Sequence, residues 1–424
     1  MNDRPVLLGA VADDFTGATD LAALMARAGL SVSLRIGVPK GDPVSDADCE
    51  VVALKIRTEP VQQAVAEALA ALDWLQAIGA GAFFWKYCST FDSTPTGNIG
   101  PVAEAMMAQL NCDQTVYCPS FPENGRTVFQ GHMFVGEELL SDSPMRNHPL
   151  TPMTDSSLLR LLAPQVTKPV GLVNRRVITG GIKSVQERLQ NLKDDGCQHI
   201  ILDAINDDDL NVLGAAVASL KLVTGGSAIA LPLVRALSGA TASRRETTEH
   251  AAIENTPLIL SGSCSAMTRK QVARFAQSHA AFQLNPLDLA KDGNALQQAK
   301  HWLGSQPPGS AKMIYATADP DEVKQAQSQL GRDKAGQVVE DALAELAQTA
   351  LQTGHRRFVV AGGESSGAVT KALAVDQLRI GKEIAPGVPW TFARTGEFDI
   401  ALALKSGNFG NESFFEQALE VLQR

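Results

Sequence analysis

The sequence predicts an α/β protein made of two α/β domains with mainly parallel sheets. Short apolar runs rich in β-branched residues alternate with segments of helical periodicity through most of the 424 residues. Helix-length segments between buried strands are the signature of βαβ units, whose strands run parallel. The alternation breaks at the polar stretch 238–257 and then resumes. We therefore predict a first domain over 1–237, a linker over 238–257 and a second domain over 258–424.

The composition is that of an ordinary globular chain, with 45% hydrophobic and 20% charged residues. A net charge of -9 argues against nucleic-acid binding, because that requires a basic surface to replace phosphate counterions. No long uncharged apolar run and no signal peptide is evident, so we expect no membrane span and a cytoplasmic location. The six cysteines form no C-x-x-C pair, which is typical of reduced thiols and not of a metal site. The sequence leaves open whether the chain forms a homo-oligomer.

The first half of the chain provides the first series of strands and helices. Apolar runs predict strands at 5–12, 31–37, 50–57, 80–88, 114–118, 168–174 and 197–205, with one more beginning at 221. Helical periodicity follows most of them, at 19–30, 60–79, 98–110, 184–196 and 207–220. Ligands of open parallel sheets bind at the carboxyl ends of the strands, so the residues after each strand are the first candidates for a site.

Polar side chains gather where three of these strands end. They are Asp13, Asp14 and Thr16, then Lys55 and Arg57, then Lys86, Ser89, Asp92 and Asn98. Arg or Lys can pair with the carboxylate of a small polyhydroxy acid, and Asp or Asn with its hydroxyls. The structural alternative is surface ion pairing for the lysines and helix capping for Asp92, and Arg126 fits either a substrate clamp or a turn cation. The recurrence at successive strand ends favours a binding site.

The adjacent carboxylates Asp13 and Asp14 need a separate explanation, because neighbouring carboxylates repel each other and gain little for a fold. We expect one of them to face the ligand and the other to cap the helix that begins near Thr16. Asp13 directly follows the strand, and it is therefore the one that we expect to face the ligand.

The second half places small residues at three junctions between a strand and the next element. Strands are expected at the start of 258–265, 312–318 and 356–373 and within 399–411, and a last helix at 412–423. The small residues include Ser261 and Ser263, Gly362, Gly363, Glu364 and Ser365, and Gly407. Glycine permits close approach, and helix N-terminal N–H groups favour phosphate. Each loop alone is weak evidence, since glycine often only satisfies a turn, but three together could build one nucleotide site.

Two common nucleotide fingerprints are absent from these loops. Gly362 and Gly367 have the spacing of a P-loop, but Ala368 and Val369 stand where Lys and Ser or Thr should follow. No G-x-G-x-x-G follows a strand. An NAD(P)-dependent oxidoreductase therefore loses support, and so does a periplasmic solute-binding protein, which would need a signal peptide.

Six segments together carry a resemblance to a known family. They are ADDFTGATDLA, KYCSTFDSTPTGNIGP, CPSFPENGRTVFQGHMFVG, MRNHPLTPMTD, GGESSGAV and LKSGNFG. This set, spread over nearly the whole chain, resembles the four-carbon acid sugar kinase family. The resemblance implies a substrate domain, then a nucleotide domain with a cleft between the two, and ATP-dependent phosphorylation of a terminal hydroxyl. Threonate and erythronate kinases of the family read more like DSTLRGN where this chain has DSTPTGN, which favours a 3-oxo-tetronate as the substrate.

The resemblance also implies roles for individual residues. ATP would be bound by Ser261, Ser263, Gly362, Gly363, Glu364, Ser365 and Gly407. The acid sugar would be bound at the rim of Asp13, Arg57, Lys86 and Asp92. From the strand-end pattern we further expect contacts to the acid sugar from Thr16, Arg57, Lys86, Ser89, Asn98 and Arg126, and a catalytic base among Asp13, Asp14 and Asp92. Phosphoryl transfer needs neutralisation of the phosphate charge, so we expect Mg²⁺ held by the phosphates and at most one carboxylate. Closure about 238–257 would exclude water from the reaction.

Overall fold

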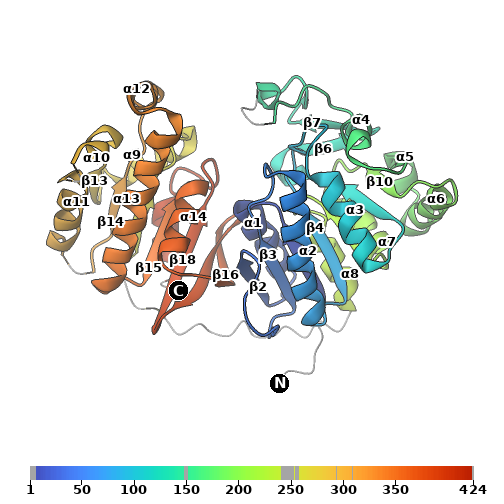
Figure 1. Ribbon diagram of the computed structural model, residues 1–424, viewed down its shortest axis with the longest axis horizontal. Helices are drawn as coiled ribbons and strands as arrows, with labels where there is room; N and C mark the ends of the chain where they lie inside the picture. Colours follow the sequence, from blue (N-terminus) through green and yellow to red (C-terminus); the bar gives the residue numbers. More distant parts are fainter. Residues whose placement is uncertain are drawn as a thin grey trace. The chain divides into compact units, whose positions relative to one another are not determined.

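The computed structural model describes residues 6–147, 151–239, 253, 257–292, 294–307 and 309–422. The chain divides into two compact units, Met1–Arg245 and Glu246–Arg424, which we call unit 1 and unit 2 (Figure 1). Both are α/β with mainly parallel strands, which confirms the predicted fold class. The predicted linker, 238–257, lies almost wholly outside the described residues.

The main sheet of unit 1 is parallel. Its strands lie in the order β2 (Val32–Ile36), β3 (Cys49–Ala53), β1 (Leu8–Ala12), β4 (Ala82–Lys86), β11 (Leu222–Gly225), β5 (Thr115–Cys118), β10 (His199–Leu202) and β9 (Val170–Val173). The strands β1, β3 and β4 are buried along their whole length, as expected for a sheet covered on both faces. All the strands predicted for this half of the chain are present.

Helices cover both faces of this sheet. They are α1 (Phe15–Ala26), α2 (Val61–Ala77), α3 (Ile99–Leu110), α4 (Leu158–Leu162), α5 (Arg175–Ile178), α6 (Ile182–Asp194), α7 (Asp207–Val217) and α8 (Ala230–Ser238). The helices α2 and α3 pack on each other, whereas α8 packs on both α1 and α7. A hydrophobic core between α2, α3 and the sheet includes Leu72, Met106, Trp85 and Tyr117. Asn206 caps α7 by accepting the N–H of Asp209 at 2.9 Å.

A small antiparallel sheet lies at the carboxyl ends of β5 and β10, and the sequence did not predict it. It consists of β6 (Arg126–Phe129), β7 (His132–Val135) and β8 (Glu138–Leu139), with the 3₁₀ turns η1 (Pro122–Asn124), η2 (Pro144–Asn147) and η3 (Ala163–Gln165) in the same region of the chain. Val128 bridges to Ala204, just after β10, and the buried Asp203 carboxylate accepts the N–H groups of Gln130 and Gly131, both at 2.8 Å. Figure 1 shows β6 and β7 beside α4.

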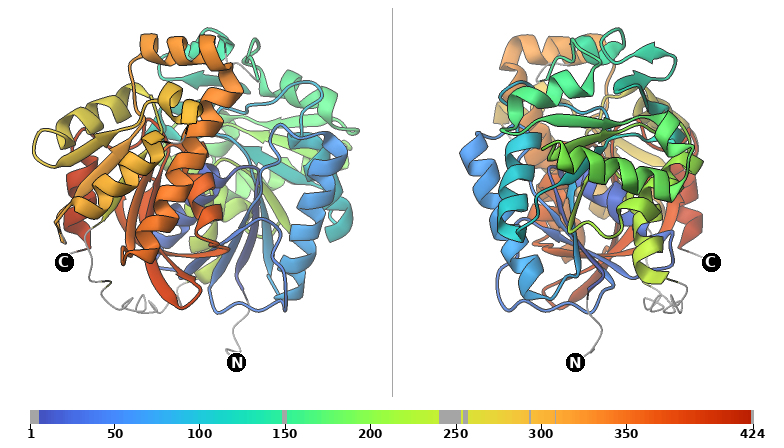
Figure 2. Two further views of the ribbon diagram at one scale, coloured as in Figure 1. Left: turned by 60° about the vertical axis from the view of Figure 1, so that its left-hand side comes forward. Right: turned by 90° about the vertical axis from the view of Figure 1, so that its right-hand side faces the viewer.

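Unit 2 has a mixed sheet. Its order is β13 (Ala280–Gln283), β14 (Lys312–Tyr315), β12 (Leu258–Ser261), β15 (Arg357–Ala361), β18 (Phe398–Lys405), β17 (Val388–Thr395) and β16 (Gln377–Ala385). The strands from β13 to β18 in this order are parallel, and β16, β17 and β18 form an antiparallel meander, orange to red in Figure 2. The sequence analysis identified only the last strand of that meander. Turn glycines with positive φ, Gly387 and Gly396, join its strands.

The helices of unit 2 are α9 (Ala266–Phe275), α10 (Pro286–Asp292), α11 (Asn294–Ser305), α12 (Pro320–Leu330), α13 (Arg332–Gln352), α14 (Gly363–Ala372) and α15 (Phe414–Val421). On one face α9 and α15 enclose a core with Phe275, Trp390 and Phe414. The long α13 contacts α10, α12 and α14, and it buries Val339, Leu343 and Leu346 at the spacing of one helical stripe. Within the part of the chain that is described, no helix is both long and apolar enough to cross a membrane.

Candidate functional site

Strand register brings the predicted polar residues of unit 1 to one edge. Ala12 pairs with both Ala53 and Lys86, and Gly225 pairs with Lys86, so β1, β3, β4 and β11 end at the same level. The residues that follow these strands therefore form one rim at the carboxyl edge of the sheet. We call this the polar rim: Asp13, Asp14, Asp20, Arg57, Lys86, Ser89 and Asp92.

Arg57 is the centre of an ion-pair cluster in this rim. Its Nε and Nη2 donate to Oδ2 and Oδ1 of Asp13 at 2.7 and 2.9 Å, and Nη2 also lies 2.7 Å from Oδ1 of Asp14. The Asp13 side chain is 4% exposed and that of Arg57 is 25% exposed. Burial raises the pKa of the Asp13 carboxyl above its usual value, and the Arg57 charge opposes that rise. The guanidinium is thus fixed by carboxylates at the rim before any ligand arrives.

The two adjacent carboxylates have different surroundings. Asp14 is the N-cap of α1, and its Oδ1 accepts the N–H of Gly17 at 3.0 Å. Asp13 contacts Arg57 and caps no helix. The geometry of Asp14 is the capping geometry that we expected of one member of the pair, and it explains why α1 begins at Phe15, earlier than the periodicity alone indicates.

Lys86 ends β4 and lies beside the first turn of α1. Its Nζ donates to the Tyr87 carbonyl at 2.7 Å, and the side chain is buried. A Cβ on Gly17 would clash with the Asp14 Oδ1 and lie 2.8 Å from this Nζ, so glycine here leaves room for both charged groups beside the first turn of the helix.

Asp20 is a charged residue of the rim that the sequence analysis missed. It is 8% exposed, burial raises the pKa of its carboxyl, and the charge of Lys86 opposes the rise. Asp20 lies four residues after Thr16 and therefore on the same face of α1. A carboxylate at this spacing, within an otherwise apolar helical segment, is the signal that could have identified it.

Asp92 and Ser89 lie in the loop after β4. The Asp92 carboxylate is 8% exposed and accepts the Thr90 hydroxyl at 2.6 Å. Among the described residues it has no cationic partner within ion-pair distance, which distinguishes it from Asp13. Ser89 is half-buried, and a Cβ on Gly226, in the loop after β11, would lie 3.5 Å from its Cβ. The loop after β11 therefore joins the rim, although the sequence analysis did not include it.

Three other predicted substrate residues take less direct positions. Asn98 is buried, and its Nδ2 donates to the carbonyls of Ile56, Arg57 and Glu59 at 2.6, 3.3 and 2.9 Å, so its amide holds the loop that carries Arg57. Thr16 is half-buried in the first turn of α1. Arg126 begins β6, and its guanidinium donates to the Asn124 carbonyl, not to a residue of the polar rim.

The predicted nucleotide loops of unit 2 also share one edge. Ser261 pairs with Tyr315 and with Ala361, and Ala361 pairs with Lys405, so the loops after β14, β12, β15 and β18 are neighbours. Gly362 has a φ of 127° and precedes α14, whose first turn contains Gly363, Glu364 and Ser365. The first backbone N–H groups of a helix have no partner within it, and they favour an anion.

Two glycines allow these loops to lie against each other. A Cβ on Gly262 would clash with the Ser365 Oγ, and one on Gly407 would lie 3.0 Å from the Ser263 Oγ. The loop after β12 thus lies close to the loops after β15 and β18, and glycine at these two positions leaves room for the serine hydroxyls.

A cavity of about 620 Å³ opens at this edge. Its lining includes Ser263, Gly362, Gly363, Glu364, Ser365 and Gly407, which are six of the seven predicted ATP residues. The seventh, Ser261, is fully buried and does not line the cavity; its hydroxyl hydrogen-bonds to that of Thr317 at 2.7 Å. Away from the glycine loops, the wall is mixed. Its apolar residues include Leu284, Pro286, Leu287, Val323, Ala326, Ala335 and Val339, and its polar or charged residues include Gln283, Asn285, Glu322, Gln325, Gln327, Arg332 and Glu340.

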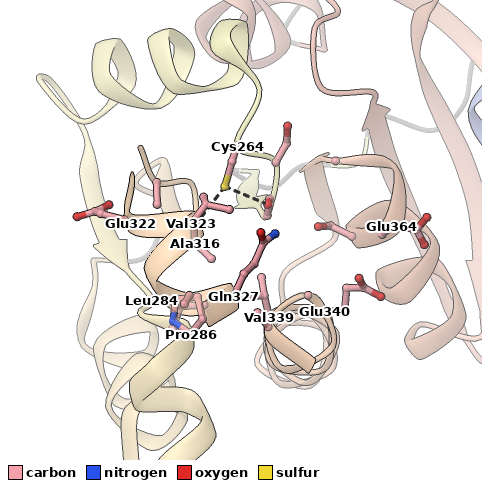
Figure 3. A pocket seen from close by; sticks show the side chains of 18 of the residues that line it. Cys264, Leu284, Pro286, Ala316, Glu322, Val323, Gln327, Val339, Glu340 and Glu364 are labelled. Atoms are coloured by element: carbon pink, nitrogen blue, oxygen red, sulfur yellow. Dashed lines mark hydrogen bonds between the residues drawn. The ribbon is translucent and has the colours of Figure 1, made fainter. Parts of the chain in front are cut away.

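Figure 3 shows the lining from close by. Leu284 and Pro286 lie side by side, Val339 lies beside Gln327 and Glu340, and Glu364 lies on the side away from Glu322. Cys264 points into the same space, where its Sγ lies 4.0 Å from the Gly262 carbonyl oxygen and 3.9 Å from that of Ala316. Apolar side chains beside an anion-favouring helix N-terminus suit a planar base linked to phosphates, and the polar lining residues offer hydrogen-bonding groups.

Two family models match separate parts of the chain. Residues 8–233 match the model of a sugar-binding N-terminal domain, and residues 258–415 match that of a nucleotide-binding C-terminal domain. A 3-oxo-tetronate kinase of Pseudomonas savastanoi pv. phaseolicola is 49% identical over 99% of this chain and 98% of its own. One of Cupriavidus necator is 50% identical with the same coverage. The chain belongs to the four-carbon acid sugar kinase family.

Solved structures of similar proteins carry the same fold. A Salmonella typhimurium LT2 protein superposes with a TM-score of 0.90 at 39% identity, over 97% of this chain and 98% of its own. A Haemophilus influenzae protein superposes with a TM-score of 0.83 at 43% identity, over 98% and 100%. As a four-carbon acid sugar kinase, the protein is a phosphotransferase that acts on a sugar acid. This membership replaces the oxidoreductase and solute-binding alternatives.

Proposed function

We propose that this kinase transfers the γ-phosphoryl group of ATP to the 4-hydroxyl of a 3-oxo-tetronate and releases 3-oxo-tetronate 4-phosphate and ADP. The observation that carries this proposal is full-length identity of 49–50% to proteins named 3-oxo-tetronate kinase. Phosphoryl transfer needs a site for the nucleotide and a site for the acid sugar. Unit 2 has an anion-favouring cavity, and unit 1 has a charged polar rim.

The unit 2 cavity is the place that we assign to ATP. The adenine ring would lie beside the apolar side chains of Val323 and Val339, and the phosphates would lie at the first turn of α14 and at Gly407. Ser261 then supports the loop from the protein interior and does not contact the ligand, since its buried hydroxyl is hydrogen-bonded to that of Thr317.

Mg²⁺ accompanies ATP in phosphoryl transfer and neutralises charge on the phosphates. No group of three or more His, Cys, Asp or Glu side chains that could hold a metal occurs among the described residues. This fits Mg²⁺, which is commonly held by phosphates and water with one or two carboxylates and without a cage of protein ligands. Glu364, in the first turn of α14 and in the cavity lining, is the residue that would contribute a carboxylate.

The polar rim of unit 1 is the place that we assign to the acid sugar. Arg57 and Lys86 are cations suited to its carboxylate, and the carboxylates and Ser89 are suited to its hydroxyls. The Nη1 of Arg57 makes no hydrogen bond within the described ranges, so it remains as a donor while Nε and Nη2 are held by Asp13 and Asp14.

Asp13 is the carboxylate that we assign to receive the proton of the acceptor hydroxyl. Burial raises the pKa of Asp13, and a raised pKa makes a carboxylate a better base near neutral pH. Asp14 is already used as the cap of α1. Asp92, with one hydroxyl donor and no cationic partner in the described part of the chain, is the second candidate.

Product analysis tests this function. Purified enzyme is incubated with Mg-ATP and, separately, a 3-oxo-tetronate, threonate or erythronate, while ADP release is coupled to NADH oxidation. The proton-coupled ³¹P spectrum of the product should show a triplet, because a phosphate on C4 couples to two protons. We expect turnover with the 3-oxo-tetronate to exceed that with the other two acids. No ADP release with any of the three would overturn the proposal, and a doublet would exclude the 4-hydroxyl as the acceptor.

A further inference from the structure

Lys405 is a buried cation that the functions described so far do not use. It ends β18 and is 0% exposed. Its Nζ donates to three oxygens: Thr268 Oγ1 at 3.0 Å, the Ser406 carbonyl at 3.0 Å and the Gly407 carbonyl at 2.8 Å. In its protonated form the side chain has three N–H donors, which match this set of oxygens.

The charge of Lys405 has no counter-charge in the described part of the chain. No carboxylate lies within ion-pair distance, and the Phe414 ring, 5.9 Å from Nζ to the centroid, is the aromatic face beside it. Burial lowers the pKa of Lys405 to about 7. Lys86 of unit 1 also ends a strand and donates to the next carbonyl. Unlike Lys405, it lies near carboxylates, and its charge opposes the rise in the pKa values of Asp13 and Asp20. A buried cation without an anion is costly, unless a ligand supplies the anion.

The three oxygens connect Lys405 to the nucleotide loops. Thr268 Oγ1 itself donates to the Gly407 carbonyl at 2.7 Å and accepts the Ser265 hydroxyl at 3.1 Å. Ser265 caps α9, and Gly407, which lines the cavity, packs against Ser263 and Ser265. Lys405 thus joins the loop after β18 to the start of α9 directly behind the cavity wall.

We propose that Lys405 is a positioning residue of the nucleotide site, whose ammonium fixes the Gly407 loop against α9 and whose unpaired charge is neutralised by the phosphates of a bound nucleoside di- or triphosphate. This inference rests on the proposed assignment of ATP to the unit 2 cavity. It explains why a lysine is buried at a strand end without a carboxylate. It also predicts that Lys405 gains a proton when the nucleotide binds, because the anion stabilises the charged form.

Other charged and titratable groups lie on, or just before, the elements that adjoin Lys405, namely α9, α14, α15, β17 and β18 itself. They are Cys264, Arg269, Lys270, Arg274, Glu364, Lys371, Asp399, Arg394, Glu412 and Glu416. Arg269, Lys270 and Arg274 of α9 pair at the surface with Asp319, Glu412 and Glu416, respectively. Arg394 pairs in register with Asp399, near the opposite end of β18. Burial lowers the pKa of Lys405, and no carboxylate lies within ion-pair distance of its Nζ among the described residues to oppose this.

Calorimetry of ADP binding to the intact enzyme tests the proposal. Titrations at about pH 8, well above the second phosphate pKa of about 6, are repeated in buffers of different ionisation enthalpy. Wild type should take up nearly one proton per ADP. Lys405→Met should lose this uptake and bind ADP at least about tenfold more weakly, because a buried charge and its hydrogen bonds are removed. KM for ATP should rise more than kcat falls.

Lys312→Met is the matched control. Lys312 is likewise a buried strand lysine, but it begins β14 and so lies at the amino edge of the sheet, where its Nζ donates to the Pro307 carbonyl at 3.3 Å. Its replacement should leave ADP affinity and proton uptake unchanged. Thr268→Val, which removes the hydroxyl between Lys405 and Gly407, should weaken ADP binding by a smaller factor and keep the proton uptake.

The outcomes separate this inference from the proposed function. Absence of proton uptake in wild type, or an unchanged ADP affinity in Lys405→Met, would overturn the role of Lys405 even if the kinase phosphorylates its acid sugar. If Lys405→Met does not fold, the proposal is still tested by the proton uptake of wild type and by the ADP affinity of Thr268→Val. Failure of wild type to bind ADP would instead overturn the assignment of the cavity.

Discussion

Arg57 donates to both carboxylate oxygens of Asp13, with Nε 2.7 Å from Oδ2 and Nη2 2.9 Å from Oδ1. This two-point contact fixes the plane of the guanidinium and leaves Nη1 for a ligand. It also connects two strand ends, because Asp13 follows β1 and Arg57 lies beyond β3. A change at either residue therefore affects both the fold of the rim and its chemistry, and the experiments must separate the two.

Replacing Asp13 and Asp14 separately by Asn distinguishes the catalytic role proposed for Asp13 from the helix-capping role of Asp14. Asp13→Asn should lower kcat by roughly 10²–10⁴-fold, as expected when a base or an orienting group is lost. Because the pKa of Asp13 is raised, the acid limb of the rate profile should lie above the usual range of a carboxyl and should disappear in this variant. Asp14→Asn should cost about 1 kcal/mol of stability or less and keep kcat, since Asn caps nearly as well as Asp. Full activity in both variants would move the base to Asp92, which Asp92→Asn would then test.

Replacing Arg57 by Ala should raise KM for the acid sugar and lower stability. Loss of a charge-assisted contact costs about 1.5–3 kcal/mol, and Asp13 would be left buried without its partner. Arg175→Ala is the matched control, since the Arg175 Nε lies 3.0 Å from the buried Asp209 carboxylate elsewhere in unit 1. Both variants should melt at lower temperature, but only Arg57→Ala should change KM. Equal KM values would assign Arg57 a purely structural role.

Replacing Gly363 by Val should abolish ATP binding and spare binding of the acid sugar. Gly363 is exposed in the first turn of α14 and lines the cavity, so a branched side chain there would occupy the space of the phosphates. Gly367→Val is the control, because it lies four residues later in the same helix and a Cβ there meets nothing within 4 Å. It should bind ATP as wild type does. Calorimetry with ATP measures both, and retained affinity in Gly363→Val would place the phosphates elsewhere.

The stability of the nucleotide-free enzyme should depend on pH through Lys405. Its pKa is lowered from 10.5 to about 7 in the folded state, so the unfolded chain binds more protons between these two values. The free energy of unfolding of wild type, relative to that of Lys405→Met, should therefore fall as the pH is lowered through this window and level off below about 7. Urea denaturation at several pH values measures the difference. A difference that does not vary with pH would show that Lys405 keeps an ordinary pKa.

Much of the fold could be predicted from local sequence. The strands β1, β4, β12 and β15 are short apolar runs, and the helices after them have clear periodicity, so hydrophobic patterning identified them. The meander β16–β18 was mostly missed, because neither β16 nor β17 follows one burial pattern along its whole length. Alternation is confined to the first half of β16, and β17 begins with consecutive buried residues. The hairpins β6–β8 were missed because they are held by distant residues, Ala204 and the Asp203 carboxylate, that local patterns do not reveal.

The candidate residues at the strand ends can be recognised without coordinates, because a parallel sheet brings whatever follows its strands to one edge. This pattern indicated Asp13, Arg57 and Lys86 in the first half and the Gly362–Ser365 turn in the second. The contacts that each of these groups makes depend on how the chain packs. Asp14 caps α1, Asn98 holds the Arg57 loop, Ser261 bonds to Thr317, and Lys405 is buried behind Gly407. Such roles depend on which atoms lie within about 3 Å across strands far apart in the chain, and hydrogen bonding at that range follows packing and not the order of residues.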